Sequence, residues 1–224
     1  MARADNKVDD AGVRLSALDS CAVSDAMDKL GFEGVVIGIS RLSSERRISG
    51  RILTVRLGAA ADNSTPTRHL GTTAVEAAGP GDIIVIEQRS GIDAAGWGGN
   101  LSLAAKLRGI AGTIVDGPAR DIDESRELDF PVFARSHTCH TARGRLVQVS
   151  TNQPITVGDV TVAPGDYVVA DGSAVVFVAQ KEIIRVLETA EAIVALEKRM
   201  AEALRGGTPV SQVMGSNYER MLRK

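Results

Sequence analysis

A glycine-rich turn that leads directly into a helix is the first feature of this sequence that could do chemistry. Gly96-Trp97-Gly98-Gly99 precedes a helix predicted to begin at Asn100-Leu101. Free backbone N–H groups and the helix dipole favour a small anion at such a point, and a phosphate or a carboxylate would fit equally well. The turn lacks the third glycine of a dinucleotide-binding motif and the Gly-Lys-Ser/Thr of a Walker loop. The alternative is a tight turn that binds nothing.

An arginine and an aspartate follow the next buried strand. The run Gly112–Val115 predicts that strand, and Asp116-Gly117-Pro118 predicts the turn that stops it, just ahead of Arg120 and Asp121. Catalytic groups commonly lie beyond the carboxyl ends of strands in α/β folds. Arg120 offers a fixed fork of donors for a carboxylate or enolate oxygen, and Asp121 is a hard oxygen ligand suited to Mg²⁺ or Mn²⁺. Because adjacent side chains point in different directions, a mutual salt bridge is not expected, and the alternative is a solvated Arg-Asp turn.

Other candidate residues are weaker. His137-Thr138-Cys139-His140 looks like a metal-binding run, but on a strand only two of its ligands share a face, and zinc usually takes three or four. His69 stands alone and favours a surface or partly buried position over a substrate contact. Asp25 and Asp28 lie on one face of the first predicted helix, which favours a capping or interface role. Trp97 is the only tryptophan and is expected to pack beside the glycine turn.

Length and composition limit the class of protein. The chain has 224 residues, 44% of them hydrophobic and 24% charged, which is typical of a single globular domain. Lysines and arginines number 26 against 28 acidic residues, a balance that argues against nucleic-acid binding. Two cysteines are too few for a disulfide framework. The polar start lacks the apolar core of a signal peptide, and no apolar stretch approaches the ~20 residues of a membrane helix. We therefore expect a cytoplasmic protein.

Hydrophobic periodicity and turn residues predict the elements that must hold these groups. Helices are expected over 15–30 (ending at Gly31), 72–78, 101–108 and 182–204. Strands are expected over 48–57, 82–87, 112–115, 131–134, 145–150, 159–162 and 167–178. The last helix is long and amphipathic, with an apolar stripe that continues to Met200. No linker divides the chain.

The central segment resembles a known family. Residues 97–121 read W-G-G-N-L-x-x-x-A-K-x-R-G-x-x-G-x-x-x-D-G-x-x-R-D, which looks like the class II 4-hydroxy-4-methyl-2-oxoglutarate aldolases. The same family contains the regulators of ribonuclease activity A and is called RraA-like. The resemblance covers about 15–205 and extends through Val23–Asp28, Gly50, Pro80–Asp82, Pro131–Arg135 and Pro164–Asp166.

The resemblance implies an α/β fold of the swivelling β/β/α type, a single domain with a central β-sandwich and flanking helices. It places the domain at 15–205, between a flexible N-terminal segment (1–14) and a C-terminal tail (206–224). It also implies a homotrimer or homohexamer with active sites between subunits.

Roles for individual residues come from the same resemblance. Arg120 matches the arginine that binds the pyruvyl oxygens and stabilises the enolate, and Asp121 matches the single protein ligand of a divalent metal, Mg²⁺ or Mn²⁺. The backbone amides expected to bind the pyruvate carboxylate are those of Gly98, Gly99, Asn100 and Leu101. Glu197 matches, more weakly, a C-terminal acid that reaches metal-bound water from the next subunit.

The implied activity is cleavage of a 4-hydroxy-2-oxo acid, of the 4-hydroxy-4-methyl-2-oxoglutarate or 4-carboxy-4-hydroxy-2-oxoadipate type, to pyruvate and a second 2-oxo acid. Oxaloacetate decarboxylation is the expected side activity, and neither nucleic acid nor membrane is an expected partner. The alternatives are a non-catalytic regulator of a ribonuclease and a lyase of the same fold acting on another small acid. Many catalytic members carry an acidic residue where this sequence has Gly99, and that departure leans toward the regulator.

Overall fold

The computed structural model describes residues 9–61 and 68–215. The helices are α1 (Asp10–Ser16), α2 (Ser20–Leu30), α3 (Thr72–Ala77), α4 (Gly99–Leu107), α5 (Ile122–Glu127), η1 (Gln180–Glu182), α6 (Ile183–Arg205) and α7 (Val210–Val213). The strands are β1 (Val35–Val36), β2 (Ser40–Arg41), β3 (Ile48–Ala59), β4 (Ile83–Glu87), β5 (Gly112–Ala119), β6 (Val132–His137), β7 (Leu146–Thr151), β8 (Ile155–Val157), β9 (Val160–Val162), β10 (Tyr167–Ala170) and β11 (Val175–Val178).

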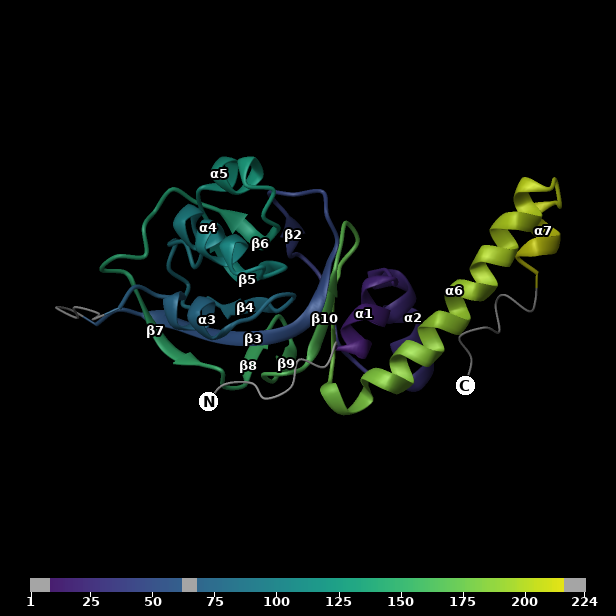
Figure 1. The fold of residues 1–224 in the computed structure, drawn as a ribbon, viewed down its shortest axis with the longest axis horizontal. Coiled ribbons are helices and arrows are strands. Elements are labelled where there is room, and N and C mark those ends of the chain that lie inside the picture. Colours follow the sequence, from purple (N-terminus) through teal and green to yellow (C-terminus); the bar gives the residue numbers. More distant parts are fainter. Residues whose placement is uncertain (1–8, 62–67, 216–224) are drawn as a thin grey trace.

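The strands form a curled sheet, a half-barrel, with helices on its outside (Figure 1). Its order is β1-β11-β10-β3-β4-β5-β6-β2, and β7 also pairs with β3. The centre, β3-β4-β5-β6, is parallel. The two-stranded ribbon β8-β9 packs its apolar side chains against one face of this sheet. The expected α/β domain with a sandwich-like centre and flanking helices is therefore confirmed, with the sandwich made by a curled sheet and a small ribbon.

Both faces of the parallel centre are buried, as its run of β-branched residues requires. In β4, Ile84 and Ile86 face the cluster that contains α3 and α4, whereas Ile83 and Val85 face the β8-β9 ribbon. A second helical layer, α1, α2 and α6, packs on β10 and β11. The α4 and α5 side and the α6 side are thus separate regions of the molecule, as Figure 1 shows.

Three predicted elements need correction. The helix expected over 15–30 is two helices, because Asp19 ends the run and caps α2 by accepting a hydrogen bond from the Ala22 amide at 2.8 Å. Gly31 ends α2 in the left-handed conformation, as predicted. The strand expected over 167–178 is the antiparallel hairpin β10-β11.

The third correction concerns the strand that leads to the candidate site. The predicted turn at Asp116-Gly117-Pro118 is wrong, because β5 runs on to Ala119 with a register irregularity between Val115 and Pro118. Gly117 is a glycine for packing reasons: a Cβ there would lie 2.6 Å from the Gln88 carbonyl oxygen.

The N-terminal segment is structured from residue 9 onward. Helix α1 begins at Asp10, buries Ala11 and Leu15, and pairs Arg14 with Glu191 of α6 at 2.8 Å. Residues 9–14, assigned above to a flexible segment, are thus part of the packed domain, whereas residues 1–8 lie outside the described residues. At the other end, the described part of the 206–224 tail contains α7.

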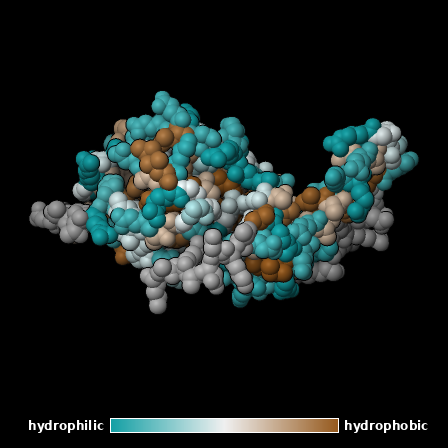
Figure 2. Space-filling model, viewed as in Figure 1, coloured by the Kyte–Doolittle hydropathy of each residue, from teal (hydrophilic) through white to brown (hydrophobic). Residues whose placement is uncertain are grey.

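Apolar surface is scattered in small patches (Figure 2). One patch lies over α4, where Leu103 and Leu107 are exposed, and further exposed apolar side chains lie along the arm formed by α6 and α7. Within the described ranges, every helix is too short or too polar to cross a membrane.

Candidate active site

The glycine turn lies against the end of β5. The Gly96 amide donates to the Pro118 carbonyl at 2.8 Å, and the Arg120 amide donates to the Trp97 carbonyl at 3.0 Å. These two bonds hold the two segments side by side, although they are more than twenty positions apart in the sequence. The N-terminus of α4 is thereby placed beside Asp121.

Asp121 is the residue at which the strand turns into α5. Its φ is 56°, in the left-handed region that non-glycine residues rarely adopt. This conformation ends the alternation of the strand and brings the carboxylate back toward the glycine turn. Oδ2 accepts hydrogen bonds from the Gly99 amide at 2.9 Å and from Arg120 Nε at 3.1 Å. The expectation that Arg120 and Asp121 would not pair is therefore wrong.

Gly98 and Gly99 have no room for a side chain. A Cβ on Gly98 would lie 2.8 Å from Asp121 Oδ2, and a Cβ on Gly99 would lie 1.9 Å from Oε2 of Glu124. Two carboxylates therefore converge on this glycine pair. Glu124 was not predicted from the sequence. The signal that could have identified it is its spacing, because an acidic residue one helical turn after Asp121 can reach the same site.

A buried hydrogen-bond chain supports the site from behind. Trp97 Nε1 donates to Ser102 Oγ at 2.9 Å, and Ser102 Oγ lies 2.9 Å from Ser125 Oγ. The Trp97 ring also stacks on Phe130, with centroids 6.2 Å apart. Trp97 therefore packs beside the glycine turn, as predicted. The chain ties α4 to α5, the two helices that carry the candidate residues.

The amides at the start of α4 remain available to an anion. The Gly99 N–H is taken by Asp121, whereas among the described residues no acceptor bonds the N–H groups of Gly98, Asn100 or Leu101. First-turn amides of a helix carry partial positive charge and have no partner within the helix. Three of the four predicted carboxylate-binding amides thus remain free.

Glu197 does not join this group within one chain. It lies on the part of α6 beyond the last buried residue, Ile193, on the other side of the sheet from α4 and α5 (Figure 1). Burial and the nearby charges of Asp25 and Asp19 raise the pKa of Glu197. Burial and the charges of Asp28 and Asp19 likewise raise the pKa of Asp25. Glu197 of α6 is therefore near the acidic side chains of Asp25 on α2 and of Asp19, which caps α2.

With this geometry established, the comparisons identify the family. The family model described as RraA-like, Aldolase/RraA, matches residues 20–177. This chain belongs to the RraA-like family.

Relatives and solved structures agree with that assignment. "Protein DlpA" of Legionella pneumophila is 28% identical over 194 residues, which are 87% of this chain but 31% of DlpA. A Halalkalibacterium halodurans protein named "Putative 4-hydroxy-4-methyl-2-oxoglutarate aldolase" is 32% identical over 78% of this chain and 79% of its own. An uncharacterized Pseudomonas syringae protein superposes with a TM-score of 0.82 at 28% identity, over 95% of this chain and 100% of that one. Streptomyces coelicolor RraAS2, titled an unusual member of the RNase ES inhibitor RraA family, shares the fold (TM-score 0.77, 23% identity, 88% of this chain and 98% of that one).

The side chains of this RraA-like site fit a hard divalent cation that keeps most of its water. Asp121 and Glu124 offer carboxylate oxygens beside the glycine pair, and Mg²⁺ is usually bound by one or two carboxylates plus water and substrate. Nowhere in residues 9–61 and 68–215 do three or more His, Cys, Asp or Glu side chains form a group able to hold a metal alone. A fully protein-ligated site, such as structural zinc, is therefore not available in the described residues.

The histidines fall outside this donor set. His140 Nδ1 pairs with Asp93 at 2.9 Å, and Cys139 is exposed. Burial and the charges of Arg143 and Arg120 lower the pKa of His69. His69 therefore lies close enough to Arg120 for the positive charge of the guanidinium to contribute to the lowering of its pKa.

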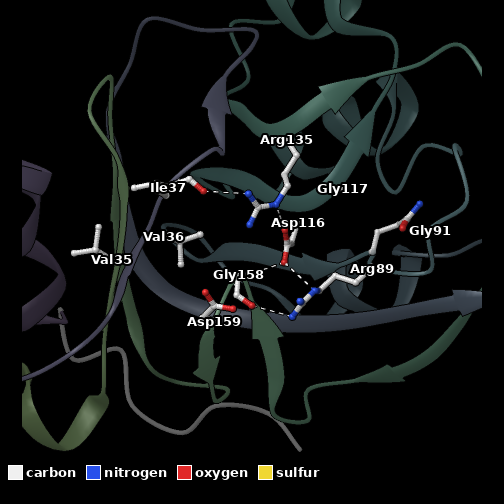
Figure 3. A pocket seen from close by; sticks show the side chains of 11 residues that line it. Val35, Val36, Ile37, Arg89, Gly91, Asp116, Gly117, Arg135, Gly158 and Asp159 are labelled. Carbon is white, nitrogen blue, oxygen red and sulfur yellow. Dashed lines mark hydrogen bonds and ion pairs between the residues drawn. The ribbon is translucent and has the colours of Figure 1, made fainter.

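A cavity on the opposite face of β5 contains a second charged group (Figure 3). Asp116 is 2% exposed and accepts from Arg135 and from the Gly158 amide at 2.8 Å, and Arg89 Nε lies 3.7 Å away. Each arginine also donates to a backbone carbonyl, of Ile37 or of Gly158. Because Asp116 pairs with both arginines and accepts from the Gly158 amide, and these contacts fasten the β8-β9 ribbon to the sheet, we assign this group a structural role.

Proposed function

We propose that this chain is a divalent-metal-dependent lyase that cleaves a 4-hydroxy-2-oxo acid to pyruvate and a second 2-oxo acid. The observation that carries the proposal is the convergence of the Asp121 carboxylate, the Arg120 guanidinium and the free amides of α4 at one point. Membership of the family and the aldolase name of a relative 32% identical support it. The exposed, unpaired cysteines suit a reducing compartment, and we place the protein in the cytoplasm.

The substrate would bind through its 2-oxo acid end. The amides of Gly98, Asn100 and Leu101 would hold the carboxylate at the positive end of the α4 dipole. The Nε of Arg120 is engaged by Asp121, which fixes the plane of the guanidinium and directs its terminal nitrogens to the 2-oxo oxygen. Asp121 would hold Mg²⁺ or Mn²⁺, which when bound supplies Lewis-acid stabilisation of negative charge on the substrate.

Cleavage then follows from where the charge develops. The 4-hydroxyl would pass its proton to a water molecule, C4 would become a carbonyl, and the electrons of the C3–C4 bond would move into a pyruvate enolate. Arg120 stabilises the enolate oxygen as the charge forms, which is the interaction that lowers the barrier. Protonation at C3 releases pyruvate. Oxaloacetate would lose CO₂ by the same route, because the enolate left behind is the same.

We further propose that the site is completed by a neighbouring copy of the chain in a homotrimer or homohexamer. Helix α6 has 23 residues, or about 34 Å at 1.5 Å per residue, and Figure 1 shows it projecting away from the sheet. No residue of α6 beyond Ile193 is buried, although exposed Leu204, Val210 and Met214 lie along the α6-α7 arm. Docking this arm on a neighbour would cover these side chains and carry Glu197 toward the neighbour's Asp121.

The test is pyruvate release from 4-hydroxy-4-methyl-2-oxoglutarate and from oxaloacetate, with Mg²⁺ and then with EDTA. Metal-dependent pyruvate from either substrate supports the lyase. No pyruvate from either substrate favours the second candidate, a non-catalytic regulator, for which the observation is Gly99 in place of the acidic residue of many catalytic members. The next experiment would then be a binding assay with a ribonuclease.

A further inference from the structure

We propose that Glu124 is a positioning residue for the divalent metal: its carboxylate occupies the space of a side chain at position 99 and accepts hydrogen bonds from the cation's hydration shell. This inference rests on the proposed function, because it assumes a cation held at Asp121. It adds a residue that neither the sequence motif nor the comparisons assign.

The space around Gly99 is the first argument. A Cβ on Gly99 would lie 1.9 Å from Glu124 Oε2, 3.0 Å from its Cδ and 3.2 Å from Asp121 Cβ. The Glu124 carboxylate therefore lies directly over the Gly99 backbone, next to the residue that would hold the metal. A side chain on residue 99 and Glu124 in this position exclude each other.

The fold of α5 is the second argument. The Ser125 amide donates to the Asp121 carbonyl at 3.1 Å, which closes the first turn of α5, and the Ser102–Ser125 contact fixes this turn against α4. Glu124 is therefore presented toward Gly99 by the same turn that presents Asp121. The two carboxylates reach the site from one rigid piece of backbone.

Glu124 differs from the adjacent acidic residue, Asp123, in its hydrogen-bond and ion-pair partners. Asp123 pairs with Arg126 at 2.7 Å, whereas the Glu124 carboxylate has no hydrogen-bond or ion-pair partner among the described residues. Asp121 is paired with Arg120 at 3.1 Å, so Glu124 is the carboxylate beside the glycine pair that no cation of the described residues neutralises. A hydrated divalent cation would stabilise both groups, and carboxylates that hydrogen-bond the surroundings of a metal orient its ligands.

The inference also explains why residue 99 is a glycine in this chain. In this chain a carboxylate occupies the space of a side chain at position 99, supplied from α5 instead of α4. The glycine then accommodates Glu124, and its presence no longer favours a non-catalytic protein.

The test is titration with Mn²⁺ alone, followed by the electron paramagnetic resonance of free Mn²⁺. The variants are Glu124→Gln, Asp121→Asn and the matched control Glu127→Gln, which removes another exposed carboxylate of α5. We expect Asp121→Asn to abolish binding, Glu124→Gln to weaken it about 10- to 100-fold, and Glu127→Gln to leave it unchanged. Thermal melts of each variant verify folding.

A second experiment moves the carboxylate from position 124 to position 99 and tests for a gain in Mn²⁺ affinity. In a Glu124→Ala background, Gly99→Asp should recover part of the lost Mn²⁺ affinity, because it returns a carboxylate to the same space. The inference is overturned if Glu124→Gln binds like Glu127→Gln while Asp121→Asn still abolishes binding, a result that leaves the proposed function standing. Wild-type protein that binds no Mn²⁺ would instead overturn the proposed metal-dependent function and this inference with it.

Discussion

Arg120 combines two roles that a lysine could not. Its Nε–H bond to Asp121 orients the guanidinium, and the remaining N–H groups form a planar fork that matches a 2-oxo acid. A Lys side chain would keep the charge but lose this bidentate geometry.

We therefore predict that Arg120→Lys lowers kcat/KM for pyruvate release by about 100- to 1,000-fold, the range for losing one preorganised charge-stabilising donor. Steady-state kinetics measure the loss, and Arg126→Lys is the control, because Arg126 pairs with Asp123 on the outer side of α5. Equal, small losses in both variants would show that Arg120 contributes only general charge.

At the residue scale, the contiguous motif from Trp97 to Asp121 predicted which groups lie together. Arg120, Asp121 and the α4 amides all lie in one segment and do come together. Two features were not predictable, because they depend on contacts across the fold. The left-handed conformation of Asp121 reverses its side chain, and the Glu124 position depends on how α5 packs on α4.

At the scale of elements, Ser102 links α4 to α5. It accepts from the buried Trp97 Nε1 and contacts Ser125 Oγ. Removing its hydroxyl leaves the indole N–H buried without an acceptor, which costs about 1–3 kcal/mol.

We predict that Ser102→Ala lowers the free energy of unfolding by that amount, whereas Ser125→Ala costs less, because Ser102 Oγ keeps Trp97 Nε1 and also bonds the Gly98 carbonyl. Urea denaturation of both variants measures the difference. A larger loss for Ser125→Ala would contradict the role of Ser102 Oγ as the acceptor that satisfies Trp97 Nε1.

Helix α1 contributes a pH-dependent contact. Burial raises the pKa of Asp9, but hydrogen bonds from Arg51 and Tyr167 outweigh it, so the pKa lies below the ordinary value of 3.8. An aspartate with a lowered pKa stabilises the fold above its unfolded pKa, and the effect is lost as pH falls through the folded value.

We predict that wild-type protein is more stable than Asp9→Asn at all pH values above 3.8, and that this advantage shrinks as the pH falls below it. Thermal melts across that range provide the comparison. An advantage that stays constant down to the acid transition would mean that Asp9 acts through packing alone.

Element prediction failed where residues with turn propensity serve a tertiary contact. Asp116-Gly117 is a turn sequence in isolation, yet Asp116 binds Arg135 and Gly158, and Gly117 lets β5 approach Gln88. Strands β3, β4, β6, β7 and β9 followed their periodicity, as did α3, α4 and α6, because local pattern and burial agree there.

At the scale of the whole molecule, the proposed completion of the active site depends on the α6-α7 arm. Its amphipathic stripe continues to Met200, as the sequence indicates, but the chain buries it only as far as Ile193. In the proposed oligomer, the surface that covers the remainder and the position of Glu197 depend on other copies of the chain, so they could not be read from one sequence.

Subunit mixing tests this arrangement. Asp121→Asn and Glu197→Gln proteins should each be impaired alone, but after dissociation and mixing in equal amounts about a quarter of the sites would pair an intact Asp121 with an intact Glu197 from a neighbour. Pyruvate release then rises above that of either parent. A mixture that merely averages its parents would place Glu197 outside the site.

We propose above that a divalent cation at Asp121 enables carbon–carbon bond cleavage to pyruvate. The most direct measurement is pyruvate release from 4-hydroxy-4-methyl-2-oxoglutarate by wild-type and Asp121→Asn protein, after EDTA treatment and again after Mg²⁺ is restored. We predict that wild-type activity disappears with EDTA and returns with Mg²⁺, whereas Asp121→Asn stays inactive in both conditions while its oligomeric state is unchanged. Full activity in EDTA, or in Asp121→Asn, would contradict it.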